Sequence, residues 1–160
     1  MIRLVKIEDA KAICGIFNYY VLNAIATFVE EPFTVADMEA KINAIHPKYP
    51  WLVYEKNGIV VGFAYANRWN ERSAYKNSVE STVYLKNGIE KQGIGSQLYS
   101  SLIERIKSEG YHSMVGGISL PNAASQKLHE KLGFKKAAHY KEIGFKFNQW
   151  IDVGYWQLII

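Results

Sequence analysis

One stretch of the sequence restricts the fold more than any other, because a strand pattern, a glycine-rich turn and a helix follow one another within 78–109. Residues 78–85 alternate in a way that predicts a strand, and Gly93-Ile-Gly95 opens an amphipathic helix predicted over 95–109. A glycine turn at a helix start directs several backbone N–H groups at one point, where the helix dipole adds positive potential. The segment therefore predicts a site that holds a pyrophosphate through its backbone.

Two familiar phosphate-binding motifs do not fit this turn. No Gly-Lys-Ser/Thr follows it, which excludes the P-loop of nucleotide triphosphatases. Leu98 stands where the dinucleotide-binding fingerprint has its third glycine. Taken alone, the Gly-x-Gly pattern is equally compatible with a simple turn at the start of a helix.

The rest of the chain predicts strands and helices that alternate only in its middle part. The predicted strands cover 2–7, 51–56, 59–67, 78–85, 113–118, 134–142 and 152–160, the last two around an insertion. The predicted helices are one capped by Asp9, one beginning at Thr34, and those at 95–109 and 122–132. Asn57-Gly58 predicts a tight hairpin. Without repeats or linkers, we expect one domain over 1–160, of the α/β (α+β) class, with a mostly antiparallel sheet that contains a parallel pair.

Composition limits the classes of function. The 160 residues are 49% hydrophobic and 14% aromatic, which suits a single domain with a real core. Nineteen basic and fifteen acidic residues give a net charge of +4, which is compatible with an anionic ligand, and the scattered basic residues do not indicate nucleic acid. No apolar run is long enough for a membrane span. Cys14 is the single cysteine, so we expect a cytoplasmic protein with no disulfide and no metal.

A second informative stretch runs from Asn122 to Phe134. Asn122 stands where a helix needs its N-cap, and Gly133 ends the predicted helix. Ser125 and His129 are four residues apart and therefore share one face of that helix. Read alone, this stretch is a capped helix with a glycine stop.

Together the two stretches resemble the GNAT superfamily of N-acetyltransferases, and within it the phosphinothricin acetyltransferases. The segments that carry the resemblance are 49–53, 64–66, 72–75, 79–84, 128–134 and 150–157, spread over nearly the whole chain. The resemblance implies the GNAT fold, a mixed, mostly antiparallel sheet flanked by helices. It also implies acetyl-CoA as co-substrate, a homodimer, and acetyl transfer to the free amine of a small amino acid such as phosphinothricin, methionine sulfoximine or methionine sulfone.

The resemblance also implies where acetyl-CoA binds. The residues expected to contact it are Val83, Tyr84 and Leu85 beside the pantetheine, Lys91, Gln92, Gly93, Ile94, Gly95 and Ser96 around the pyrophosphate, and Asn122 and Ser125 on the pantetheine side. Lys131 is a further candidate for a phosphate contact. Glu90 departs from the family pattern, which has Gln or Arg at this position. Because a carboxylate would repel phosphate, we expect Glu90 to turn toward solvent.

Two residues are candidates for proton transfer. Strand alternation places Glu80, Thr82 and Tyr84 on one face of the sheet. Glu80 is the expected general base for the substrate ammonium, the alternative being a solvated strand residue. His129 occupies the place where many family members carry a tyrosine that protonates the departing thiolate. Its alternative is a helix histidine that is hydrogen-bonded beneath the sheet.

The acceptor site is the least determined. An amino-acid acceptor carries an anion, for which Arg72 with Tyr75 is the expected binding site. Phe28 and Glu30 are expected to form the opposite wall, and Lys146 and Trp150 are further candidates. Two other functions stay open: acetylation of a different amine (polyamine, aminoglycoside or protein amine), and a CoA-binding sensor without turnover.

Overall fold

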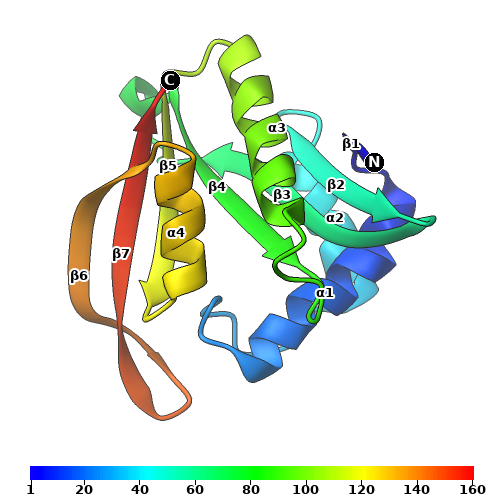
Figure 1. Ribbon diagram of the computed structural model, residues 1–160, viewed down its shortest axis with the longest axis horizontal. Coiled ribbons are helices and arrows are strands. Elements are labelled where there is room, and N and C mark those ends of the chain that lie inside the picture. Colours follow the sequence, from blue (N-terminus) through cyan, green and yellow to red (C-terminus); the bar gives the residue numbers. More distant parts are fainter.

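One seven-stranded sheet forms the middle of the protein and carries helices on both of its faces (Figure 1). The computed structural model describes residues 1–160. The strands are β1 (Ile2–Leu4), β2 (Trp51–Lys56), β3 (Ile59–Arg68), β4 (Ser78–Leu85), β5 (Ser113–Leu120), β6 (Lys135–Lys146) and β7 (Gln149–Ile159). The helices are α1 (Ala10–Asn23), α2 (Val35–Ile45), α3 (Ile94–Ser108) and α4 (Ala123–Lys131), with 3₁₀ turns at Ile7–Asp9 and Ser73–Tyr75.

The order of the strands is β1-β2-β3-β4-β5-β7-β6, and only β4 and β5 run parallel. This arrangement confirms the predicted α+β class and the mixed, mostly antiparallel sheet flanked by helices. The helices α3 and α4 begin within one residue of their predicted starts.

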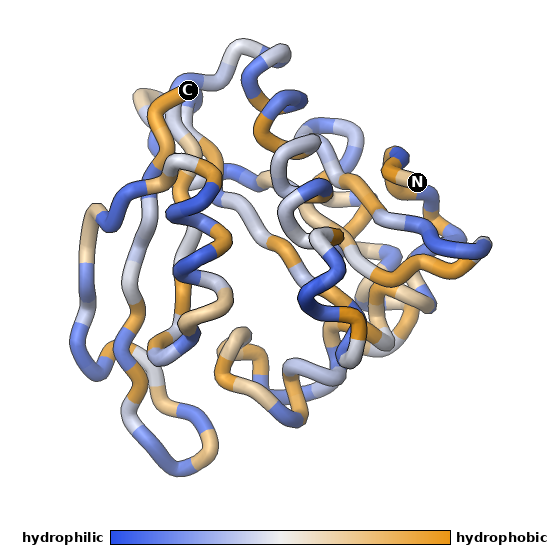
Figure 2. The backbone as a smooth tube through the Cα atoms, viewed as in Figure 1, coloured by the Kyte–Doolittle hydropathy of each residue, from blue (hydrophilic) through white to orange (hydrophobic).

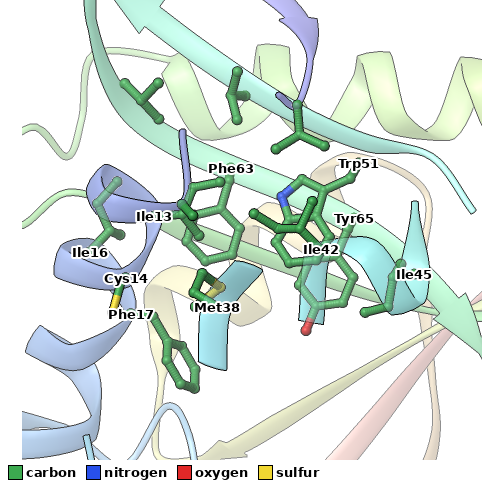
Figure 3. Close-up of a cluster of buried hydrophobic side chains, with 14 of the residues drawn as sticks. Ile13, Cys14, Ile16, Phe17, Met38, Ile42, Ile45, Trp51, Phe63 and Tyr65 are labelled. Carbon is green, nitrogen blue, oxygen red and sulfur yellow. The ribbon is translucent and has the colours of Figure 1, made fainter. Parts of the chain in front are cut away.

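Two layers of apolar side chains join the helices to the sheet. Helices α1 and α2 pack on one face, where the rings of Trp51 and Tyr65 stack with centroids 4.2 Å apart (Figure 3). Helix α3 packs on the other face through Leu98 and Leu102, which are fully buried. Figure 2 shows hydrophobic and hydrophilic residues alternating along the helices, as amphipathic helices require. Side chains on the two faces of the sheet therefore meet different helices.

The strongest local signals of the sequence are confirmed. Thr34 caps α2, because its hydroxyl accepts from the Asp37 backbone N–H at 3.1 Å and the Asp37 carboxylate accepts from the Thr34 backbone N–H at 2.8 Å. Asn57 and Gly58 join β2 to β3 with positive φ angles of 52° and 74°.

The first prediction that fails concerns Asp9. Its carboxylate does not cap α1; it accepts from the Lys6 backbone N–H at 2.8 Å and forms an ion pair with Arg3 at 2.8 Å. A 3₁₀ turn therefore precedes α1, and β1 ends at Leu4 instead of continuing to residue 7. The ion pair with Arg3 competes successfully with the helix end for the same carboxylate.

The second prediction that fails concerns the C-terminal strands. No separate insertion lies between them, because β6 continues to Lys146 and β7 begins at Gln149, so that they form one long hairpin. Phe147 and Asn148 make the turn with φ angles of 51° and 58°. Strand β5 is also longer than predicted and ends at Leu120.

Strands β4 and β5 pair only over their first three residues, Ser78–Glu80 with Ser113–Val115. Beyond this point the two strands diverge (Figure 1). The far half of β4 keeps its ladder to β3 on one side and has no strand partner on the other. No helix of the protein combines the length and the apolar character needed to cross a membrane.

Candidate functional site

A cavity of about 1010 Å³, called here the central cavity, lies where β4 and β5 diverge. Its walls come from β4, β5, the start of α3, helix α4, and the loop between α1 and α2, with further residues from α1, α2, β3 and β7. The C-terminal parts of both parallel strands therefore border the same space. Most of the residues predicted from the sequence meet here, and they lie on three of these walls.

The open edge of β4 forms one wall. Val83, Tyr84 and Leu85 line the cavity, and all three pair with β3 on their other side. Because N–H and C=O groups alternate in direction along a strand, half of the backbone groups here face away from β3. The Leu85 carbonyl is already satisfied by the Tyr20 hydroxyl at 2.6 Å. The remaining outward groups of this edge can hydrogen-bond an extended ligand as a strand would.

The turn before α3 forms the second wall. Gly93, Gly95 and Ser96 line the cavity, and Gly93 adopts a φ of 76° that favours glycine. Helix α3 begins at Ile94, so its first backbone N–H groups, which have no partner within the helix, are at the cavity edge. Lys91 also lines the cavity. This wall can bind an anion through backbone donors.

The same loop carries three further residues named from the sequence, Glu90, Gln92 and Ile94. Ile94 is buried in the core, and the Gln92 side chain accepts from Lys56 at 2.9 Å, so neither side chain lines the cavity. The Glu90 carboxylate is exposed and accepts from the Gly88 backbone N–H at 3.0 Å. Glu90 thus folds back onto its own loop, although it still lines the cavity next to Lys91.

The start of α4 forms the third wall. The Asn122 side chain accepts from the Ser125 backbone N–H at 3.1 Å, which confirms Asn122 as the N-cap. Both residues line the cavity. Lys131, at the end of α4, also lines it and donates to the Ser96 hydroxyl at 3.4 Å. A basic side chain therefore lies beside the turn before α3.

Glu80 lies in the cavity on β4, directly opposite Asn67 of β3. Its carboxylate has no hydrogen-bond partner and no ion-pair partner in the protein. Burial raises the pKa of Glu80 above the usual value for a glutamate. The nearby Tyr155 also lines the cavity, and the charge of Glu80 adds to the burial that raises the pKa of the Tyr155 phenol. A half-desolvated, unpaired carboxylate is suited to accept a proton from a ligand.

His129 also lines the cavity, but its side chain is only 4% exposed. Its Nδ1 lies 2.7 Å from the Ser125 carbonyl, which accepts hydrogen bonds only, so Nδ1 carries a hydrogen. Its Nε2 lies 3.1 Å from the Tyr99 hydroxyl, which in turn contacts the Ser81 hydroxyl. Burial lowers the pKa of His129, which favours the neutral ring, and in a neutral ring with its hydrogen on Nδ1 the Nε2 atom accepts from Tyr99. Both ring nitrogens are therefore occupied by protein partners.

The acceptor end of the cavity differs from what the sequence predicted. Phe28 lines the cavity, as expected. Glu30 lines a separate open groove next to it. Arg72 and Tyr75 are exposed on the segment before β4 and do not line the cavity of this chain. Trp150 is 64% exposed on the β6–β7 hairpin and also lies outside the cavity.

Lys146 has a structural position that the sequence did not indicate. It is 2% exposed, and its Nζ donates to the carbonyls of Ala24 at 2.6 Å and Thr27 at 2.8 Å, with Tyr20 at 3.3 Å. These carbonyls lie at the end of α1 and in the following loop, which carries Phe28. Lys146 therefore joins the β6–β7 hairpin to one wall of the cavity without lining the cavity itself.

Among the cavity residues that were missed in the sequence, one carries a charge at the acceptor end. Lys41 of α2 lines the acceptor end, with its Nζ over three aromatic rings. The signal was present, because Lys41 lies three residues after Met38 and four before Ile45, on the apolar face of its helix. A basic residue on such a face needs a structural explanation.

Comparison with known protein families and structures gives a consistent result. The model of the acetyltransferase (GNAT) domain matches residues 2–154. The phosphinothricin N-acetyltransferase of Streptomyces viridochromogenes is 39% identical over 156 residues, covering 98% of this chain and 85% of the relative. The L-methionine sulfoximine/L-methionine sulfone acetyltransferase of Salmonella typhimurium is 35% identical, covering 98% and 92% of the two chains.

A solved structure agrees with these relatives. The phosphinothricin acetyltransferase of Sinorhizobium meliloti, a crystal structure in complex with acetyl-CoA, superposes with a TM-score of 0.96 at 33% identity. The match covers 100% of this chain and 88% of that one.

Proposed function

Because the chain belongs to the GNAT acetyltransferase family, we propose that it transfers an acetyl group from acetyl-CoA to the free amine of a small amino acid or analogue. One observation carries the proposal. The unpaired carboxylate of Glu80 shares a cavity with the open edge of β4 and with the free N–H groups at the start of α3. A proton acceptor and two kinds of cofactor-binding backbone thus lie together.

The cavity walls fit acetyl-CoA in three ways. The open edge of β4 at Val83–Leu85 suits the amide-rich pantetheine arm, which can pair as a strand. The turn at Lys91–Ser96 suits the pyrophosphate, with backbone donors supplemented by Lys91 and Lys131. Asn122 and Ser125 face the same arm from α4. With the arm between β4 and α4, the thioester would lie near Glu80.

Glu80 serves as the general base in the proposed reaction. Its carboxylate takes a proton from the ammonium of the acceptor, directly or through water, and the freed amine attacks the thioester carbonyl. Backbone N–H groups on the open edge of β4 stabilise the negative oxygen that forms, a contribution often worth about 10²–10³ in rate for each donor. The C–S bond then breaks, leaving the acetylated amine and a thiolate that takes up a proton.

His129 could either donate a proton to the thiolate or hold α4 in place, and its contacts favour the second role. To donate a proton from Nε2, the ring must first be protonated, and burial opposes this. Its bonds to Ser125 and Tyr99 instead connect α4 to α3. We therefore assign His129 to positioning the α4 wall. Donation of a proton to the thiolate is the competing role that a variant must test.

The relatives and the charges of the cavity support an amino acid or analogue as the acceptor. The relatives named above are acetyltransferases of phosphinothricin and of methionine sulfoximine or sulfone. A polyamine or aminoglycoside site needs several carboxylates, whereas Glu80 is the only acidic residue that lines the acceptor end of the central cavity, with Glu30, Glu31 and Asp37 lining the neighbouring groove. A sensor without turnover has no use for an unpaired, half-buried carboxylate.

The deciding experiment is a thiol-release assay with acetyl-CoA. The acceptors are phosphinothricin, methionine sulfoximine, methionine sulfone, spermidine, an aminoglycoside and a peptide with a free N-terminus. The proposal expects release with the amino-acid analogues and little with the others. Release only with spermidine or only with the peptide would assign the protein to a different acceptor class. If no amine in the panel causes release, the alternative of a CoA-binding sensor without turnover is favoured.

The proposal also includes that the protein forms a homodimer and acts in the cytoplasm. The β6–β7 hairpin exposes apolar side chains at Tyr140, Ile143, Phe145, Phe147 and Trp150. Patches of this kind are typical of protein interfaces. Light scattering should give twice the mass of one chain, and Trp150→Asp should lower it to that of one chain.

A further inference from the structure

Lys41 is the one basic residue at the acceptor end of the central cavity. The other two lysines that line it, Lys91 and Lys131, lie at the anion-binding turn. Arg72 is outside the cavity of this chain. A cation at the acceptor end therefore has no role in the binding of acetyl-CoA proposed above.

Aromatic rings, and no carboxylate, hold the ammonium group of Lys41. Its Nζ lies 5.3 Å from the ring centre of Phe17, 5.7 Å from that of Phe33 and 5.3 Å from that of Tyr65. It takes part in none of the ion pairs of the protein. Cation–π contacts stabilise a cation without neutralising it. Lys41 thus keeps a net positive charge available to a ligand.

The position of Tyr65 relates Lys41 to the proposed base. Tyr65 of β3 lies directly opposite Thr82 of β4, and Glu80 is two residues further along the same face. Two residues of a strand span about 7 Å. Lys41, which lies over the Tyr65 ring, and Glu80 therefore lie on the same face of the sheet and line one cavity. This arrangement suits a small molecule that carries both an ammonium and an anion.

We propose that Lys41 binds the anionic group of the amino-acid acceptor while Glu80 receives the proton of its amine. The proposal rests on the proposed function and narrows it to acceptors that carry a carboxylate or phosphinate beside the reacting amine. The same charge disfavours polyamines, because their second ammonium would lie against Lys41. Lys41 would thereby be the residue of this chain that selects amino acids among amines.

The experiment compares matched acceptors with and without the anion. Methionine sulfone is tested against its carboxamide and against 3-(methylsulfonyl)propylamine, and phosphinothricin against its carboxamide, which keeps the phosphinate. The variants are Lys41→Met, Lys41→Arg and, as a control, Lys48→Met. Lys48 also contacts one aromatic ring, at 5.9 Å from the centre of Tyr49, but lies outside the cavity.

We expect Lys41→Met to lower kcat/KM for methionine sulfone about 10- to 100-fold, the range that loss of one charged contact gives. Its kcat/KM for the carboxamide, its KM for acetyl-CoA and its melting temperature should stay close to those of the wild type. Lys41→Arg should retain most of the preference for the acid, and Lys48→Met all of it. Phosphinothricin carboxamide keeps the phosphinate and lacks the carboxylate, so it shows which anion Lys41 binds. If Lys41→Met still lowers kcat/KM for this compound, Lys41 binds the phosphinate. If kcat/KM for this compound is unchanged, Lys41 binds the carboxylate.

An equal loss for methionine sulfone and its carboxamide would overturn the proposal, because Lys41 would then act on something other than the anion. Calorimetric titration of methionine sulfone into the wild type and Lys41→Met, with CoA present, separates this failure from that of the proposed function. Weaker binding in the variant supports Lys41 even if no amine is acetylated. Equal binding in the two proteins contradicts it whether or not turnover occurs.

Discussion

The tip of the Phe28 ring points at Gly144, so that a β-carbon at Gly144 would overlap three of the ring carbons. Phe28 belongs to the loop between α1 and α2 and lines the central cavity, whereas Gly144 lies in β6. The absence of a side chain at one strand position thus lets the β6–β7 hairpin support the wall of the acceptor end.

The first prediction follows from this contact. Gly144→Ala should displace the Phe28 ring and raise KM for the amino-acid acceptor several-fold, with KM for acetyl-CoA unchanged. Steady-state kinetics with each substrate varied in turn measures the effect. Gly15→Ala is the matched control, because a methyl group there meets no atom within 4 Å and replaces glycine within a helix, which should stabilise the fold by about 0.5–1 kcal/mol. Equal kinetics for Gly144→Ala and the wild type would contradict the prediction.

Lys146 supports the same wall through hydrogen bonds. Lys146→Met removes the donor for three carbonyls at the end of α1 and in the loop that follows, and should lower the free energy of unfolding by about 1–3 kcal/mol. KM for the acceptor should rise more than KM for acetyl-CoA. Denaturant titration and kinetics provide the two measurements. Lys141→Met, an exposed change on the same strand, should alter neither quantity.

Glu80→Gln should lower kcat by about 10²–10⁴, the usual contribution of a general base, and leave acetyl-CoA binding intact. Since burial raises the pKa of Glu80, the carboxylate ionises only above the usual glutamate range. In the wild type, kcat/KM should therefore fall as the pH drops through that raised pKa. Unchanged turnover in the variant would remove Glu80 from the mechanism.

The same carboxylate links activity to stability. A raised pKa in the folded state means that folding favours protonated Glu80, so this group contributes stability at low pH that is lost as the pH rises. Glu80→Gln cannot ionise and should melt at a higher temperature than the wild type at neutral pH. The difference should disappear near pH 4. A lower melting temperature at neutral pH would show instead that the carboxylate stabilises the fold.

The parts of the fold that could be predicted from the sequence depend on interactions between residues that are near one another in the sequence. The hairpin at Asn57 and Gly58 needs two positive φ angles, and the alternation that directs Glu80 into the cavity needs only the two-residue period of a strand. The β6–β7 hairpin was missed because the sequence between its strands lacks a glycine turn: Phe147 and Asn148 both adopt the left-handed conformation. Glycine-based turn rules give no signal there.

The acceptor end could not be predicted in the same way. Its wall depends on Phe28 meeting Gly144 and on Lys146 meeting Thr27, contacts between segments more than a hundred residues apart. No local pattern encodes such a pair. Arg72 was predicted because an anion needs a cation, but the cation that this chain places at the acceptor end of its cavity is Lys41. In the sequence, the only sign of Lys41 was a basic residue on the apolar face of a predicted helix.

His129→Ala distinguishes positioning from proton donation. The change leaves the Tyr99 hydroxyl and the Ser125 carbonyl without this partner, and should cost about 1–3 kcal/mol of stability. Because α4 carries Asn122 and Ser125, KM for acetyl-CoA should rise while kcat stays within about tenfold of the wild type, a smaller loss than proton transfer contributes. A hundredfold loss of kcat with unchanged KM and melting temperature would establish His129 as the acid.

Gly93→Ala tests the anion-binding turn, and Gly58→Ala provides a matched control. Both glycines adopt nearly the same φ, 76° and 74°, and an added methyl group meets no atom closer than 3.8 Å at either position. Each substitution should therefore cost a similar 1–2 kcal/mol or so for the left-handed conformation. Only Gly93 lines the cavity, so only Gly93→Ala should also raise KM for acetyl-CoA, by shifting the backbone donors at the start of α3. If the two variants lose stability equally and both keep the wild-type KM, the pyrophosphate does not depend on this turn.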